Sequence, residues 1–303
     1  MTTGSIDQER LAELRHARVP YVHARVVLAA RPTSAKPGDE AVVLADGTIE
    51  GFVGGACAES TVVAQSLALL DSGETLLLRI TPEPEPEQPG KQVVHNPCLS
   101  GGTLEVFLQP VLPAPRLVVV GDAPVARALA DLAVRVGFSV AAEGGPFDEG
   151  AAGDASALVV ASHGRDEEEA LAVALRAGVP YVGLVASRKR GEAVVASLDV
   201  CGSMKGRVHT PAGLDIGART PHEVALSILA EIVATRPRPT GRPVTAEAGG
   251  SATATLDPVC GMTVAAVESS LHLDHEGVRV WFCGSGCLRA FAADPSRYQT
   301  QPS

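Results

Sequence analysis

The chain has 303 residues, of which 46% are hydrophobic and 20% are charged, and its formal net charge is −10. This length suits about two domains with a small additional module, and the apolar fraction suits a globular protein with a buried core. The acidic balance argues against a nucleic-acid-binding protein, which would need a basic face. The sequence has no apolar run of the roughly 18 residues that a membrane span requires and no signal-peptide pattern. We therefore expect a cytoplasmic protein with reduced cysteines and no membrane partner.

Residues 1–112 predict a mixed α/β domain. The pattern that begins at Ser5 is typical of a capped helix, and Glu59–Ser72 has the composition of a second helix that ends before Gly73. The segment PEPEPEQPGK (82–91) is expected to form an exposed, extended loop. Short apolar runs predict strands at Ala24–Ala30, Ala41–Leu44, Glu50–Val53, Leu76–Ile80 and Thr103–Leu108.

Two cysteines of this domain lie beside pairs of glycines. GFVGGACAES (51–60) is expected to form a turn that enters a helix at Glu59, and a helix N-terminus either binds an anion or lowers the pKa of Cys57. HNPCLSGGTLEVFL (95–108) places Cys98 before a second glycine pair. The two turns indicate either a shared pocket for a phosphorylated, sulfur-bearing ligand or buried cysteines beside structural turns. The candidate residues are Gly54, Gly55, Cys57, Glu59, Cys98, Gly101 and Gly102.

These two stretches resemble the XdhC/CoxI family of accessory factors for molybdenum hydroxylases, and the resemblance covers residues 11–110. The Gly-Gly-Ala-Cys-Ala-Glu form is more similar to the CoxI branch than to XdhC proper. The resemblance implies a protein that binds the molybdenum cofactor, protects it while its terminal sulfur is installed, and hands it to an apo-enzyme. It implies cofactor or sulfur contact for Cys57 first and for Cys98 second.

Residues 115–236 predict a Rossmann-like, doubly wound α/β domain, because strand-like and helix-like segments alternate. A stiff joint rich in proline precedes it at Val111–Pro115. The predicted strands are Leu117–Val120, Ser139–Ala142, Ala157–Ala161 and Tyr181–Val185. The predicted helices are Ala123–Gly137, Asp166–Ala177, Gly191–Leu198 and Pro221–Ala234.

The first strand, turn and helix of this domain have the order of a dinucleotide site. Gly121 is the one glycine that remains of the G-x-G-x-x-G fingerprint, because Ala123 and Ala126 occupy the other two positions. Glu143 has close to the usual spacing for an acid that binds the ribose. The helix N-terminus still suits an anion. The pattern favours a scaffold without NAD(P), with nucleotide binding as the alternative.

Polar residues follow two later strands of the same domain. Ligands of doubly wound sheets bind outside the carboxyl ends of the strands. We expect Ser187 and Arg188 to bind phosphate and His163 to contact a ligand or relay a proton, the alternative being solvated loop residues. VVASHGRDEEEALAVAL (159–175), YVGLVASRKRGEAV (181–194) and TPAGLDIGARTPHEVALSILAEIVA (210–234) resemble the C-terminal domain of the same family.

The last part of the chain predicts a flexible linker at 237–255 and a small metal-binding module at 256–303. A module below about 50 residues rarely builds enough core to fold alone, so a metal ion would stabilise it. Thiolates select Zn²⁺, Cu(I) or iron. The alternative to a metal site is that the three cysteines of the module are buried structural thiols. The candidate ligands are Cys260, Cys283 and Cys287, with a fourth from His272, His275 or Asp257.

The tail resembles the YHS domain, a relative of the TRASH metal-binding modules. The resemblance is carried by DPVCGM (257–262), WFCGSGC (281–287), Phe291 and Asp294-Pro295. It implies a small β-β-α module that senses or carries metal for a larger partner.

Together these resemblances predict a maturation factor that acts as a cofactor-insertion chaperone more than as an enzyme with its own turnover. Molybdenum cofactor (molybdopterin) is the predicted cargo. The predicted partners are an apo molybdenum hydroxylase, of the carbon monoxide dehydrogenase type rather than the xanthine dehydrogenase type, and a sulfur-donating cysteine desulfurase. Copper delivery and a structural zinc both explain the tail, and a homodimer is expected. The rival hypotheses are an NAD(P)-dependent oxidoreductase and a metal-responsive regulator.

Overall fold

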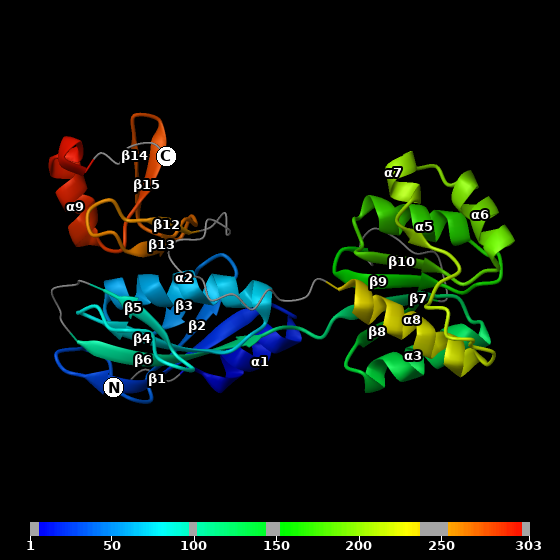
Figure 1. Ribbon diagram of the computed structural model, residues 1–303, viewed down its shortest axis with the longest axis horizontal. Helices are drawn as coiled ribbons and strands as arrows, with labels where there is room; N and C mark the ends of the chain where they lie inside the picture. The colour runs from blue at the N-terminus through cyan, green and yellow to red at the C-terminus, as the bar shows by residue number, and fades with distance from the viewer. Residues whose placement is uncertain (1–5, 97–101, 144–151, 237–253, 299–303) are drawn as a thin grey trace. The chain divides into compact units, whose positions relative to one another are not determined.

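The computed structural model of the chain describes residues 6–96, 102–143, 152–236 and 254–298. The chain divides into two compact units, residues 1–113 with 239–303 and residues 114–238. Each unit contains a sheet of its own (Figure 1). Among the described residues, no helix is long and apolar enough to cross a lipid bilayer.

The first unit is built on a six-stranded sheet with helices on both faces. Its elements are α1 (Gln8–His16), β1 (Tyr21–Ala30), β2 (Glu40–Leu44), β3 (Ile49–Gly51), α2 (Ala56–Ser72), β4 (Leu76–Thr81), β5 (Gln92–His95) and β6 (Thr103–Val111). The strand order is β3-β2-β1-β6-β4-β5, in which β4 and β5 are parallel and the other described pairs are antiparallel. Successive side chains of a strand face opposite sides. Ala41 and Val43 therefore pack with α2, which lies across one face (Figure 1), and Val42 packs with α1.

Two local predictions for this unit were wrong. The helix α2 begins at Ala56 rather than Glu59, so Cys57 lies inside its first turn. Asp7 is the N-cap of α1, and its carboxylate accepts a hydrogen bond from the Glu9 N–H; the expected cap Ser5 lies outside the described residues. The proline-rich segment 82–91 contains no helix and is largely exposed, as predicted, and Arg79 of β4 binds Glu85 of this segment at 2.9 Å. The short strand β5 directly after that segment was not predicted.

The second unit confirms the doubly wound prediction. Its elements are β7 (Arg116–Val120), α3 (Pro124–Arg135), β8 (Ser139–Glu143), β9 (Ala155–Val160), α5 (Glu167–Arg176), β10 (Tyr181–Leu184), α6 (Arg188–Ser197), α7 (Gly202–Lys205), β11 (Val208–His209) and α8 (Pro221–Thr235). The parallel strands run in the order β11-β10-β9-β7-β8. Leu117 and Val119 pack with α3 and α8, whereas Val118 and Val120 pack with α5 on the other face. A sheet buried on both faces explains the continuous apolar strands.

The tail consists of two short hairpin-like sheets and a helix. Its elements are β12 (Ala254–Leu256), β13 (Thr263–Ala265), β14 (His272–His275), β15 (Val278–Trp281), α9 (Ser285–Ala293) and the 3₁₀ turn Pro295–Tyr298. The predicted β-β-α order is present as β14, β15 and α9. The β12–β13 pair was not predicted, and β12 begins within the predicted linker. β13 packs on α2, where Ala265 is buried in the core of the first sheet.

Candidate functional site

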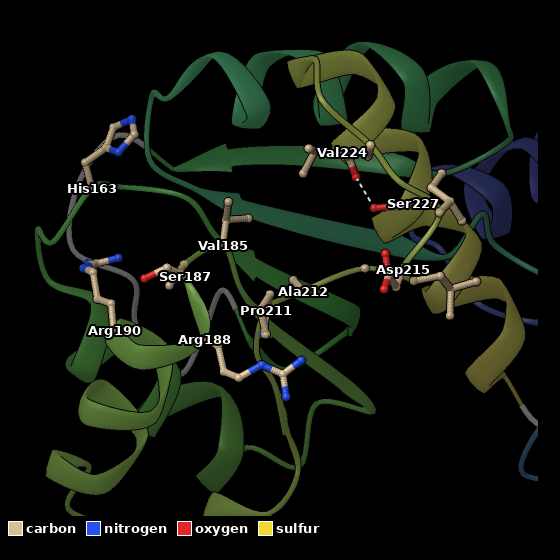
Figure 2. A pocket seen from close by; sticks show the side chains of 15 residues that line it. His163, Val185, Ser187, Arg188, Arg190, Pro211, Ala212, Asp215, Val224 and Ser227 are labelled. Atoms are coloured by element: carbon tan, nitrogen blue, oxygen red, sulfur yellow. Dashed lines mark hydrogen bonds between the residues drawn. The ribbon is translucent and has the colours of Figure 1, made fainter.

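A cavity of about 730 Å³ lies at the carboxyl ends of β9 and β10 in the second unit (Figure 2). His163, Ser187 and Arg188, which were predicted from sequence, all line it. Arg190 and the loop Pro211–Asp215 complete much of the wall. The position is the one that the doubly wound fold uses for ligands. The structure therefore brings together the three predicted residues of this unit that follow strands β9 and β10.

The positive charge of this cavity comes from the start of α6. That helix begins at Arg188 rather than the predicted Gly191, with Ser187 in an extended N-cap conformation. No side chain of the described residues caps the helix, so its first N–H groups are open to a ligand. Arg188 and Arg190 add guanidinium groups to the lining of the cavity, and Figure 2 shows them on opposite sides of Ser187. This arrangement is suited to a phosphate or another anion.

A buried carboxylate, which the sequence analysis missed, supports the wall of this cavity. Glu167 is 1% exposed, accepts hydrogen bonds from the Gly164 N–H at 2.8 Å and the Ser162 hydroxyl at 3.2 Å, and forms an ion pair with Arg190. His163 sits in the same turn with φ of 55°. A left-handed conformation at such a residue needs support from its surroundings. Glu167 therefore fixes two residues that line the cavity, His163 and Arg190.

A second carboxylate, that of Glu231, holds the loop Pro211–Asp215, which also lines the cavity. Glu231 of α8 accepts hydrogen bonds from the Tyr181 hydroxyl at 2.6 Å and the Gly213 N–H at 2.8 Å, and its other oxygen lies 3.1 Å from Nδ1 of His209. Burial opposes ionisation of Glu231, but the hydrogen bonds from Tyr181, Gly213 and His209 outweigh it and hold the pKa below its ordinary value. Burial and the neighbouring Glu231 raise the pKa of Tyr181. The loop that carries Gly213 is thus tied to the core of the unit.

Gly121, the remaining glycine of the dinucleotide fingerprint, lies outside the lining of this cavity and packs against backbone. It has φ of 112°, and a Cβ placed on it would lie 2.4 Å from the Ala161 carbonyl oxygen. Gly121→Ala should therefore lower the unfolding free energy by at least about 2 kcal/mol. Thermal unfolding measures this loss. The control is Gly202→Ala, where nothing lies within 4 Å. Equal stability of the two variants would show that Gly121 has no packing role.

A smaller cavity, of about 210 Å³, lies at the start of α2 in the first unit. Gly55 and Cys57 of the first turn and Gly102 of the second turn all line it. Gly102 is needed because a Cβ there would lie 2.0 Å from the Pro32 carbonyl oxygen. Gly54 is buried, and Glu59 lies in the first turn of α2, where burial raises its pKa. Cys98 and Gly101 lie outside the described residues.

The three cysteines of the tail meet in one cluster. Sγ of Cys283 lies 3.5 Å from Sγ of Cys260 and 3.6 Å from Sγ of Cys287. The Asp257 carboxylate joins them, and one ligand atom from each residue lies within 4.8 Å of all the others. The pKa of Cys260 is lowered because the Cys283 thiol donates to it, whereas burial and then Asp257 raise the pKa of Cys287 to about 12.

The donors of this cluster fit a soft metal ion. The sulfur separations are close to the edge of about 3.8 Å expected for a tetrahedral zinc–thiolate site with bonds of about 2.3 Å. The two candidate histidines lie elsewhere, since Nδ1 of His272 contacts the Ser270 carbonyl at 2.8 Å and the His275 ring packs on Phe291. Of the three candidates for a fourth ligand, Asp257 is the one that the fold brings to the cysteines.

Models of two protein-family domains match the chain. The model described as the XdhC Rossmann domain matches residues 117–232, and the one described as the XdhC and CoxI family matches residues 14–81. Both ranges end before the tail, so the YHS resemblance of the tail stays a prediction.

Individual relatives include the uncharacterized protein YqeB of Escherichia coli K12, 29% identical over 249 residues, which are 73% of this chain and 44% of that protein. A probable xanthine dehydrogenase component of Bacillus subtilis 168 is 28% identical over 160 residues, which are 45% of this chain and 47% of that protein. The chain thus aligns with about half the length of these relatives. A solved structure described as a xanthine dehydrogenase from Bacillus halodurans covers 77% of this chain and 97% of its own, with a TM-score of 0.35 and 16% identity.

Proposed function

Since the chain belongs to the XdhC and CoxI family, we propose that it is a maturation factor for a molybdenum hydroxylase. In this proposal it binds the molybdenum cofactor as cargo, holds it while its terminal sulfur is installed, and delivers it to the apo-enzyme. The observation that supports a phosphorylated cargo is the cavity at β9 and β10, where the uncapped start of α6 meets Arg188 and Arg190.

Size alone does not decide where the body of the cargo would bind, because the first unit also has a cavity of about 740 Å³, beside Gln65, Lys91 and His95. A ligand pocket for a drug-sized molecule has about 300–1,000 Å³. The cavity of about 730 Å³ in the second unit lies in this range, whereas that of about 210 Å³ beside Cys57 lies below it. We assign the phosphate and pterin to the second unit because its cavity combines this volume with the uncapped start of α6. Ser187, Arg188 and Arg190 would lie at the phosphate. Cys57 is assigned to sulfur chemistry or another small group.

The partners follow from the same proposal. The client is an apo molybdenum hydroxylase of the xanthine dehydrogenase or aerobic carbon monoxide dehydrogenase type, and a cysteine desulfurase would supply the sulfur. The name of the relative in Bacillus subtilis, which refers to xanthine dehydrogenase, supports a client of this class. We also propose that the protein works in the cytoplasm as a homodimer. The tail would bind Zn²⁺ or Cu(I) through Cys260, Cys283 and Cys287.

The test is the molybdenum content of the protein, purified without oxygen from cells that make the cofactor. We expect molybdenum and pterin in near-stoichiometric amounts in the wild-type chain and much less in Arg188→Ala. The matched control is Lys189→Ala, because Lys189 is an exposed cation of the same helix that lies outside the cavity lining. Absence of molybdenum from the wild-type protein, or equal loss in both variants, would contradict the proposal.

A further inference from the structure

Two helices from distant parts of the chain begin at the thiol cluster of the tail. Cys57 is the second residue of α2, and Cys287 is the third residue of α9. No side chain among the described residues caps either helix. Because a helix N-terminus carries partial positive charge, both ends stabilise thiolates and an anionic metal–thiolate cluster.

Cys57 is in direct contact with this cluster. Its thiol shares a hydrogen bond with Cys283, and its side chain packs in the same group as Cys260 and Cys287. The N-cap of α9 also lies close, since a Cβ placed on Gly284 would lie 3.8 Å from Sγ of Cys57. The first domain and the tail therefore share this group of sulfur atoms.

The tail packs on α2 through buried apolar side chains. Ala265 of β13 is 1% exposed in the same core as α2. The Ser269 hydroxyl donates a hydrogen bond to the Asp46 carbonyl at 3.0 Å, which ties the tail to the β2–β3 turn. Apolar burial and a hydrogen bond thus hold the tail against the start of α2.

Both carboxylate oxygens of Asp257 already accept hydrogen bonds from backbone N–H groups. Its Oδ1 accepts from the Val259 N–H at 2.9 Å, its Oδ2 accepts from the Cys283 N–H at 2.8 Å, and the residue is fully buried. A carboxylate held by two backbone donors orients the loop that carries Cys283. A soft metal ion also prefers sulfur to oxygen. Asp257 is therefore a positioning residue, which leaves the fourth ligand position to another donor.

We propose that Cys57 supplies this fourth ligand, so that one soft metal ion is bound by Cys57, Cys260, Cys283 and Cys287 across the first domain and the tail. This inference rests on the metal-binding part of the proposed function. Cys57 packs against the tail cluster but is not one of the residues whose ligand atoms lie within 4.8 Å of one another. Metal binding would therefore draw its sulfur inward. The same thiol lines the cavity of about 210 Å³, so metal binding by the tail withdraws Cys57 from that cavity. Metal and a ligand of the cavity then compete for one sulfur.

The first test counts the thiolates around a metal probe. Co²⁺ is added to the reduced, metal-free full-length chain, and the sulfur-to-cobalt charge-transfer absorption is measured, because its intensity rises with each Co–S bond. We expect Cys57→Ser to lose about a quarter of this intensity and to weaken Zn²⁺ binding, measured by chelator competition, by at least about tenfold. The control Cys201→Ser removes an exposed thiol of the other unit and should change neither value. An unchanged spectrum for Cys57→Ser overturns the inference.

The second test needs no variant. The rate at which N-ethylmaleimide alkylates each cysteine of the wild-type chain is measured by mass spectrometry, with and without one equivalent of Zn²⁺. We expect Zn²⁺ to slow the labelling of Cys57, Cys260 and Cys287 by at least about tenfold and to leave Cys201 unchanged. If the tail cysteines are protected and Cys57 is not, this inference fails while the metal-binding proposal stands. If none is protected, both fail.

Discussion

Asp257→Ala should open the tail locally while the rest of the chain stays folded. The substitution removes the acceptor of the Val259 and Cys283 N–H groups in a fully buried position. Each buried donor that loses its partner costs about 1–3 kcal/mol. A total loss of about 3 kcal/mol corresponds to roughly 100-fold less protection from exchange. The measurement is amide hydrogen exchange over residues 254–298 in the presence of a chelator, so that a bound metal does not contribute.

The control is Asp274→Ala, an acidic residue of the same module that is exposed and pairs with Arg279 at 3.0 Å. An exposed ion pair contributes little to stability, so exchange in this variant should match that of the wild-type chain. If Asp257→Ala lost protection only when metal was present, Asp257 would be a ligand rather than a positioning residue. If its protection did not change under either condition, the hydrogen bonds from Val259 and Cys283 would not stabilise the tail.

The architecture was predictable because it depends on apolar periodicity. Alternation of strands and helices after Pro115 predicted the second unit, and the structure confirms it with opposite faces for Val118 and Val119. The short elements α7 and β11 were missed, since four and two residues are too few for a period to be recognised. β5 was missed for a related reason, because its four residues directly follow a proline-rich segment.

The candidate sites were predictable where they follow strand ends or glycine pairs, and not where they depend on distant contacts. His163, Ser187 and Arg188 follow predicted strands, and one cavity contains all three. The contact of Cys57 with Cys283 joins residues at opposite ends of the chain, and no local pattern encodes it. Glu167 was overlooked for another reason. Glu167, Glu168 and Glu169 all lie in the first turn of α5, where the helix dipole favours any acidic residue. Only the folded structure shows that Glu167 is the buried one.

Glu167→Ala should destabilise the second unit by about 3 kcal/mol, near the low end of the range for breaking a buried ion pair because Arg190 is partly exposed and can be hydrated. The substitution also removes the acceptor of the Gly164 N–H, in a turn where His163 has φ of 55°. Hydrogen exchange in residues 152–198 measures the loss. Because His163 and Arg190 both line the cavity, the molybdenum content of the purified protein should fall as well.

The control variant Glu168→Ala distinguishes the effect of the buried Glu167 carboxylate from the effect of removing one negative charge from the first turn of α5. Glu168 is exposed on the same turn of α5, and its loss changes the net charge and the helix dipole by the same amount. We expect it to keep both the stability and the molybdenum content of the wild-type chain. If the two variants behaved alike, the ion pair with Arg190 would have no part in shaping the cavity. If Glu167→Ala lost stability but kept its molybdenum, the cargo would bind without the wall that Glu167 supports, and Arg190 would have no part in the phosphate site.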